Sequence, residues 1–163
     1  MKRLIAACAM TIGLLTTLVS ASQSPNVDIP TRARGADRVV VGTVVSVEAA
    51  FEKNEFGDEL IVSHAVVEID QNLKGNAPTA FVDVDVEGGT VGVITLKVSD
   101  LPSVERGERA VFFLKKRGGS DVHVPHLRGL GILKLNANDV VSGSNLTLDE
   151  IRSMVRGNGA AQH

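Results

Sequence analysis

Two stretches rich in β-branched residues decide the fold: ADRVVVGTVVSV at positions 36–47 and ELIVSHAVVEI at positions 59–69. β-Branched residues favour extended strands. The segment between them, EKNEFGD at positions 52–58, is charged and contains the Asn and Gly typical of a turn. The pattern therefore predicts a long β-hairpin that closes at Leu73-Lys74-Gly75.

Further strands follow the hairpin. Because side chains alternate along a strand, the odd-numbered residues of 39–47 are expected on one face and the even-numbered ones on the other. The segment 80–86 alternates most cleanly, which predicts Ala80, Val82, Val84 and Val86 inside and Phe81, Asp83 and Asp85 in solvent. Apolar or alternating runs predict more strands at 90–98 and 109–115, with short ones at 121–124, 131–135 and 139–142.

The period of the pattern changes near the C-terminus. Thr147 and Glu150 have the spacing of a capping box, and Gly157 is the expected stop of the helix. Between them, one apolar helical stripe is formed by Leu148, Ile151, Met154 and Val155. The chain is therefore expected to be mainly β: a small antiparallel OB-like barrel, or a sandwich, with a short C-terminal amphipathic helix. A barrel is preferred because closure removes exposed strand edges.

The chain divides into four expected segments. Residues 1–21 are a signal peptide, since a basic start precedes an apolar run, with cleavage after Ala21. Residues 22–35 are a polar leader, either one helical turn after Pro30 or a disordered tether. A single barrel domain with its helix spans 36–157, and 158–163 form a disordered tail. The protein is thus expected to be exported, periplasmic or secreted, with no stable membrane span after cleavage.

Composition limits the partners. The one cysteine, Cys8, lies in the signal peptide, so no disulfide is expected in the mature domain. Removing Lys2 and Arg3 from the 17 basic residues leaves 15 against 19 acidic ones, a formal charge of −4. Nucleic acid and anionic membranes favour basic surfaces, so neither is an expected partner. Trp and Tyr are absent, which leaves few rings for base stacking.

The strand layout resembles a known family. The stretches at 36–44, 67–75 and 107–114 resemble the netrin-like module, the OB-type barrel also found in tissue inhibitors of metalloproteinases. They are also similar to exported bacterial proteins of unassigned function. The resemblance covers about residues 36–135 and implies an exported module whose loops meet a protein partner. It does not imply the inhibitor activity, because in that family an N-terminal cysteine engages the protease metal.

Three histidines are the candidate metal ligands. His123 and His126 flank a Val-Pro turn, and His64 on the second strand is a possible third ligand for zinc or copper. Against this reading, residues three apart in an extended chain point to opposite faces. Ordinary loop histidines are the preferred interpretation.

Two other groups of residues suggest chemistry only weakly. Asp83, Asp85 and Glu87 share one strand face, as paired carboxylates or calcium ligands do, but such a row is more often a solvated surface. Ser63 beside His64 would project from the opposite face of its strand, and no G-x-S-x-G motif occurs. No catalytic set and no cofactor are therefore expected.

Two charged loops are the candidate binding elements. The first is the hairpin tip, with Lys53, Asn54, Glu55 and Phe56. The second is the basic tip formed by Lys115, Lys116 and Arg117. The preferred prediction is a non-enzymatic, exported module that binds a protein or envelope component through these loops. The alternative is a zinc- or copper-binding protein that uses His123, His126 and His64.

Overall fold

The computed structural model describes residues 28–54, 56–75 and 79–159. Within them the helices are α1 (Ile29–Gly35), a 3-10 helix η1 (Arg128–Gly131) and α2 (Leu148–Gly159). The strands are β1 (Arg38–Lys53), β2 (Glu59–Lys74), β3 (Phe81–Glu87), β4 (Gly89–Val91), β5 (Ile94–Leu96), β6 (Arg109–Lys116), β7 (His123–Pro125) and β8 (Ile132–Lys134). The expected signal peptide and its cleavage site lie outside the described residues.

Five strands close into a ring. Neighbouring strands pair in the order β1-β2-β3-β7-β6, and β6 pairs back to β1. Every pairing in the ring is antiparallel except that of β3 with β7, which is parallel and rests on the single residue pair Val84 and His123. The expected mainly β, OB-like barrel with a C-terminal helix is confirmed. The ring is weakest at the seam between β3 and β7.

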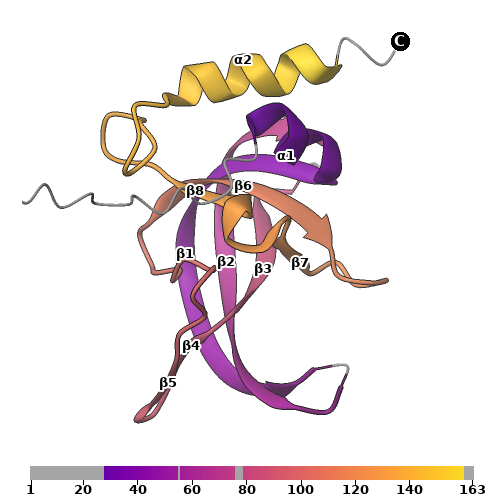
Figure 1. Ribbon diagram of the computed structural model, residues 1–163, viewed down its shortest axis with the longest axis vertical. Helices are drawn as coiled ribbons and strands as arrows, with labels where there is room; N and C mark the ends of the chain where they lie inside the picture. The colour runs from indigo at the N-terminus through magenta and orange to yellow at the C-terminus, as the bar shows by residue number, and fades with distance from the viewer. Residues whose placement is uncertain (1–27, 55, 76–78, 160–163) are drawn as a thin grey trace, which may run out of the picture.

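Figure 1 shows how the elements are distributed around the barrel. Helices α1 and α2 lie over one end, and the long β1–β2 hairpin projects from the other end together with the smaller β4–β5 hairpin. The segment predicted as one strand, 90–98, is this separate two-stranded hairpin. Gly92, with a φ of 61°, turns the chain between its strands. No helix of the described chain is long and apolar enough to cross a membrane.

A bulge in β1 corrects the expected alternation of its side chains. The pairing of β1 with β2 shifts register between Val44 and Ser46, so one extra residue is inserted there. As a result, Val44 and Val47 both pack against the barrel interior, although strict alternation had placed them on opposite faces. The interior core also takes residues from β2, β3, β6 and β8: Ala65, Val67, Val82, Val84, Val86, Ala110, Phe112, Leu114 and Ile132.

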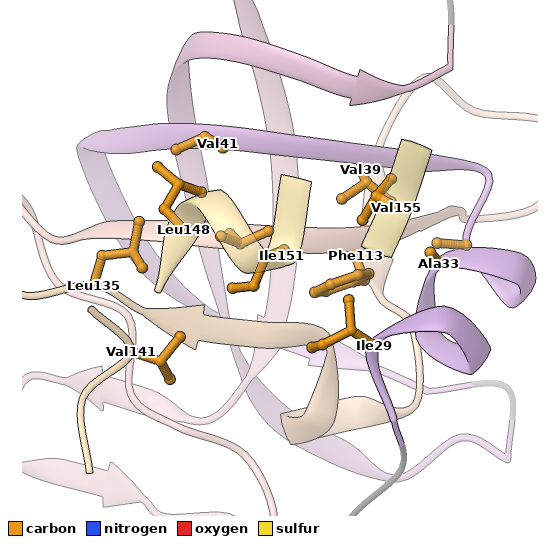
Figure 2. Close-up of a cluster of buried hydrophobic side chains, with 12 residues drawn as sticks. Ile29, Ala33, Val39, Val41, Phe113, Leu135, Val141, Leu148, Ile151 and Val155 are labelled. Atoms are coloured by element: carbon orange, nitrogen blue, oxygen red, sulfur yellow. The ribbon is translucent and has the colours of Figure 1, made fainter. Parts of the chain in front are cut away.

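A second core lies outside the ring, between the barrel and the two helices (Figure 2). Ile151 and Val155 of α2 and Ile29 and Ala33 of α1 pack with side chains of the sheet, among them Phe113 of β6. β6 is therefore buried on both faces, as its continuous apolar run predicted. The described part of the leader is thus a packed helix, and the disordered-tether alternative is wrong for it.

Side-chain hydrogen bonds fix the C-terminal end of α1 and the N-terminal end of α2. Lys74, at the end of β2, donates from Nζ to the backbone carbonyls of Ala33 and Ala36 at 2.7 and 2.6 Å. At the start of α2, the amide of Glu150 donates to Thr147 Oγ1 at 3.3 Å and the amide of Thr147 donates to Glu150 Oε2 at 2.8 Å, which confirms the capping box. The helix continues past Gly157 to Gly159, so the expected stop was too early. Residues 160–163 of the expected tail lie outside the described residues.

Candidate functional site

A cleft lies on the outer surface of β1, β2 and β3, beneath the loop that joins β6 to β7. Its volume is about 130 Å³. The strand register explains why these side chains share a face, since Leu60 lies opposite Glu52 and Val62 lies opposite Glu87. The cleft is lined by Glu52, Lys53, Asn54, Leu60, Val62, Asp85, Glu87, Arg117 and Val124.

A charged network ties the three strands to the β6–β7 loop at this cleft. Asp85 accepts from Arg117 Nη1 at 2.6 Å through Oδ2, and its Oδ1 lies 2.7 Å from His64 Nδ1. The other ring nitrogen, Nε2, lies 3.1 Å from Glu52 Oε1. A protonated His64 can therefore donate to both carboxylates at once, and Arg117 bridges the loop to the sheet.

The placement of Asp85 corrects the predicted solvated row of carboxylates on β3. Asp83 and Glu87 are exposed, but Asp85 is buried, with 8% of its surface exposed. The reason is tertiary: the β6–β7 loop places Arg117 against β3. A buried carboxylate needs charged or hydrogen-bonding partners, and Asp85 has two.

The histidine in this network is not poised for nucleophilic catalysis. Both of its ring nitrogens face carboxylates, so neither is directed at a hydroxyl. The neighbouring Ser63 projects to the other side of the strand, as predicted, and its Oγ donates to the carbonyl of Gly88 at 2.7 Å. The chemistry that the cluster offers is ion pairing and hydrogen bonding.

The other two candidate histidines lie elsewhere. His123 is 7% exposed and lines a second pocket of about 430 Å³ with Arg38 and Lys116. The His126 ring lies against Gly35, where an added Cβ would come within 2.1 Å of Nε2. Burial lowers the pKa of both histidines; nearby Arg38 lowers that of His123 further, and Lys115 that of His126.

The structure does not bring the candidate metal ligands together. Among the described residues, no group of three or more His, Cys, Asp or Glu side chains is placed to hold a metal ion. His64 uses both ring nitrogens in its own network. The geometry therefore gives the metal-binding alternative no support.

The first predicted binding loop, the hairpin tip, divides between the cleft and the solvent. Lys53 and Asn54 line the cleft. Asn54 also holds the turn, because its Oδ1 accepts from the amides of Phe56 and Asp58, both at 2.9 Å. Phe56 is 81% exposed at the tip, and Glu55 lies outside the described residues.

The second predicted loop also contributes. Arg117 enters the cleft, whereas Lys116 lines the second pocket and pairs with Asp121 at 3.3 Å. Lys115 is exposed on β6. The two loops selected from the sequence thus meet at one cleft through Lys53, Asn54 and Arg117.

Sequence reasoning missed the residues that make the floor and the anchor of the cleft. Leu60, Val62 and Glu52 belong to a predicted hairpin, and its pairing register would have placed them on one face. No local signal marks Asp85 as buried, because its partners come from β2 and from the β6–β7 loop.

The fold and the cleft together define a small OB-like barrel with a surface cleft, apolar at its floor and charged at its rim, beside two loops. No protein-family model and no curated protein matches the chain.

Proposed function

We propose that the chain is an exported, non-enzymatic binding module that holds a protein or envelope partner at the cleft on β1, β2 and β3. The observation that carries this proposal is the convergence of the two charged loops on one cleft, through Lys53, Asn54 and Arg117. OB-type barrels commonly bind their ligands on this face, between the corresponding loops.

The composition of the cleft supports a protein partner. Its floor is apolar, with Leu60, Val62 and Val124, and its rim is charged, as in protein interfaces with a dry centre and a polar edge. Its volume, about 130 Å³, is below the roughly 300–1,000 Å³ of small-molecule sites. A single inserted side chain suits this space better than a whole metabolite does.

The charges of the cleft disfavour nucleic acid. Glu52, Asp85 and Glu87 line it against Lys53 and Arg117. A nucleic-acid surface needs an excess of cations to neutralise phosphates. The face instead suits a partner that brings its own positive charge.

The test compares the captured partners of matched variants. The tagged mature protein is cross-linked in an envelope extract of the producing cells, and the bound proteins are quantified by mass spectrometry. Arg117→Ala and Leu60→Gln alter the cleft, whereas Arg106→Ala removes the same charge from an exposed turn. The proposal predicts that both cleft variants lose a partner that the wild type and Arg106→Ala retain. Equal capture by all four proteins would contradict it.

A further inference from the structure

One half of β1 has an edge that no strand of the described chain covers. β2 pairs with β1 as far as Lys53, whereas β6 pairs only with Arg38 to Thr43. The last hydrogen bonds on that side join Val44 to Gly107 and Glu108. From Ser46 to Lys53, the outer edge of β1 is therefore free of any strand in residues 28–54, 56–75 and 79–159.

The hairpin turn identifies the backbone groups that point outward. The amide of Asn54 donates to the carbonyl of Asp58 at 2.9 Å, so Asn54 directs its backbone groups inward, to β2. Inward and outward residues alternate along an antiparallel ladder. Counting back from Asn54, the residues that direct both N–H and C=O away from β2 are Val47, Ala49, Phe51 and Lys53.

The side chains of this edge alternate in character. Val47, Ala49 and Phe51 share one face of β1. On this face Phe51 is 44% exposed, and β4 contacts β1 at Ala49. On the other face, exposed Glu48 and half-buried Glu52 are separated by the small Ala50. The edge thus presents an apolar side that ends at exposed Lys53, and an acidic side that is continuous with the cleft through Glu52. Glu52 also pairs with His64 and Arg117, so Glu48 is the more accessible of the two carboxylates.

We infer that the partner adds a strand of its own to this edge, antiparallel to β1, with apolar and basic residues in alternation. Main-chain hydrogen bonds to Val47, Ala49, Phe51 and Lys53 would hold it, as in other complexes formed by strand addition. Its apolar residues lie beside Phe51, and its basic residues lie beside Glu48 and Glu52. This inference rests on the proposed function and specifies how the partner binds.

Charge complementarity selects a foreign basic strand over a second copy of this chain. A two-fold pairing that uses all four outward residues places Val47 opposite Lys53 and therefore Glu48 opposite Glu52, twice in each dimer. Like charges directly opposite destabilise a strand pair. Glu48 thereby discourages self-pairing, the usual hazard of an open edge.

The test uses a fluorescein-labelled octapeptide of alternating lysine and valine, with binding to the mature protein measured by anisotropy. In the antiparallel arrangement the valines lie on the apolar side and use their own N–H groups to bond β1. N-methylation of the valines should weaken binding by about tenfold or more, whereas N-methylation of the lysines should not. An alternating glutamate and valine peptide should not bind.

A matched pair of protein variants tests the same hydrogen bonds. Phe51→Ala and Phe51→Pro both lose the ring, but only the proline loses the outward N–H, and proline is tolerated at an edge position of this kind. The proline variant should bind the lysine-valine peptide about tenfold more weakly than the alanine variant. Equal affinities of the Phe51→Ala and Phe51→Pro variants for the peptide would overturn the inference. So would equal affinities of the valine-methylated and unmethylated peptides, or a loss of affinity caused by lysine methylation alone.

Two further outcomes separate the alternatives. If the free protein dimerises and Phe51→Pro abolishes the dimer, the edge pairs with a second copy of the chain, and the proposal of a basic partner strand is overturned. If the peptide result fails while Arg117→Ala still loses its captured partner, the cleft proposal stands and strand addition falls. If Arg117→Ala has no effect while the peptide binds as described, the cleft proposal falls and the edge is a site by itself.

Discussion

The two halves of β1 share one strand but have opposite surroundings. From Arg38 to Val44 the strand is paired on both edges, with the barrel core on one face and the second core on the other. From Ser46 to Lys53, β2 is the one strand of the described chain that pairs with it, and Glu48, Ala50 and Phe51 are exposed. The bulge after Val44 marks the boundary between them.

This difference separates the half of β1 that stabilises the fold from the half that we propose for partner recognition. The first half buries five consecutive residues, from Arg38 to Gly42, and so contributes to the folding of the barrel. The second half has exposed side chains and, on its outer edge, backbone groups that no described strand pairs; both cost little to leave in water, and we propose that a partner uses them. Mutations in the two halves should therefore have distinct consequences.

The largest expected contrast is between two phenylalanines. Phe113, buried in the second core against the first half of β1, should lose about 3–5 kcal/mol of unfolding free energy on substitution by alanine. Phe51→Ala in the second half should cost much less, about 1 kcal/mol, since nearly half of Phe51 is already exposed. Urea denaturation of both variants measures the difference. Similar losses would remove the distinction between the halves.

A smaller contrast concerns added methyl groups. A Cβ at Gly42 would lie 2.4 Å from the carbonyl oxygen of Glu68 on β2, so Gly42→Ala should destabilise the protein by about 1–3 kcal/mol. Ala50→Val, in the exposed half, should change stability by less than about 0.5 kcal/mol. Thermal and urea unfolding check both values, and a tolerated Gly42→Ala would contradict the close strand contact.

The pH dependence of stability should arise in part at the buried His123. Burial and the nearby Arg38 and Lys116 lower the pKa of His123 in the folded state, so the unfolded chain binds more protons below about pH 6.5. Stability should therefore fall as the pH decreases from 7 to 5, by at most about 1.4 kcal/mol per pH unit for this one group. His123→Gln should flatten the slope of unfolding free energy against pH. A rise in the unfolding free energy of the wild type between pH 7 and pH 5 would contradict this prediction.

The smallest expected effect on stability is at Glu48. Glu48→Gln and the control Glu68→Gln, both exposed, should each change the unfolding free energy by less than about 0.5 kcal/mol. Only Glu48→Gln should weaken binding of the lysine-valine peptide, by about threefold, the size expected for an exposed ion pair. Equal peptide affinities in the two variants would deny Glu48 a role in recognition.

The sequence was sufficient for features that depend on local pattern. The β1–β2 hairpin, the doubly buried β6 and the Thr147 capping box all follow from residue periodicity and turn chemistry. The sequence was insufficient where contacts between distant segments determine the strand register or the burial of a side chain. The bulge after Val44 follows from the pairing of β1 with β2, and the burial of Asp85 follows from the placement of Arg117.

The candidate site shows the same division. Both candidate binding loops were selected from their charge and turn residues, because such features are local. Their meeting at one cleft depends on ring closure, which brings β7 beside β3. The free edge of β1 was not predictable either, since it results from where β6 stops pairing.

Residue-resolved amide hydrogen exchange of the free protein measures the difference between the two halves of β1. We expect slow exchange throughout Val39–Val44, and an alternation of slow and rapid exchange beyond the bulge. There the amides of Glu48, Ala50 and Glu52 should be protected, and those of Val47, Ala49, Phe51 and Lys53 should exchange rapidly. Protection of all amides from Val47 to Lys53 would mean that the outer edge of β1 is already covered, and would rule out an edge that is open to a partner strand.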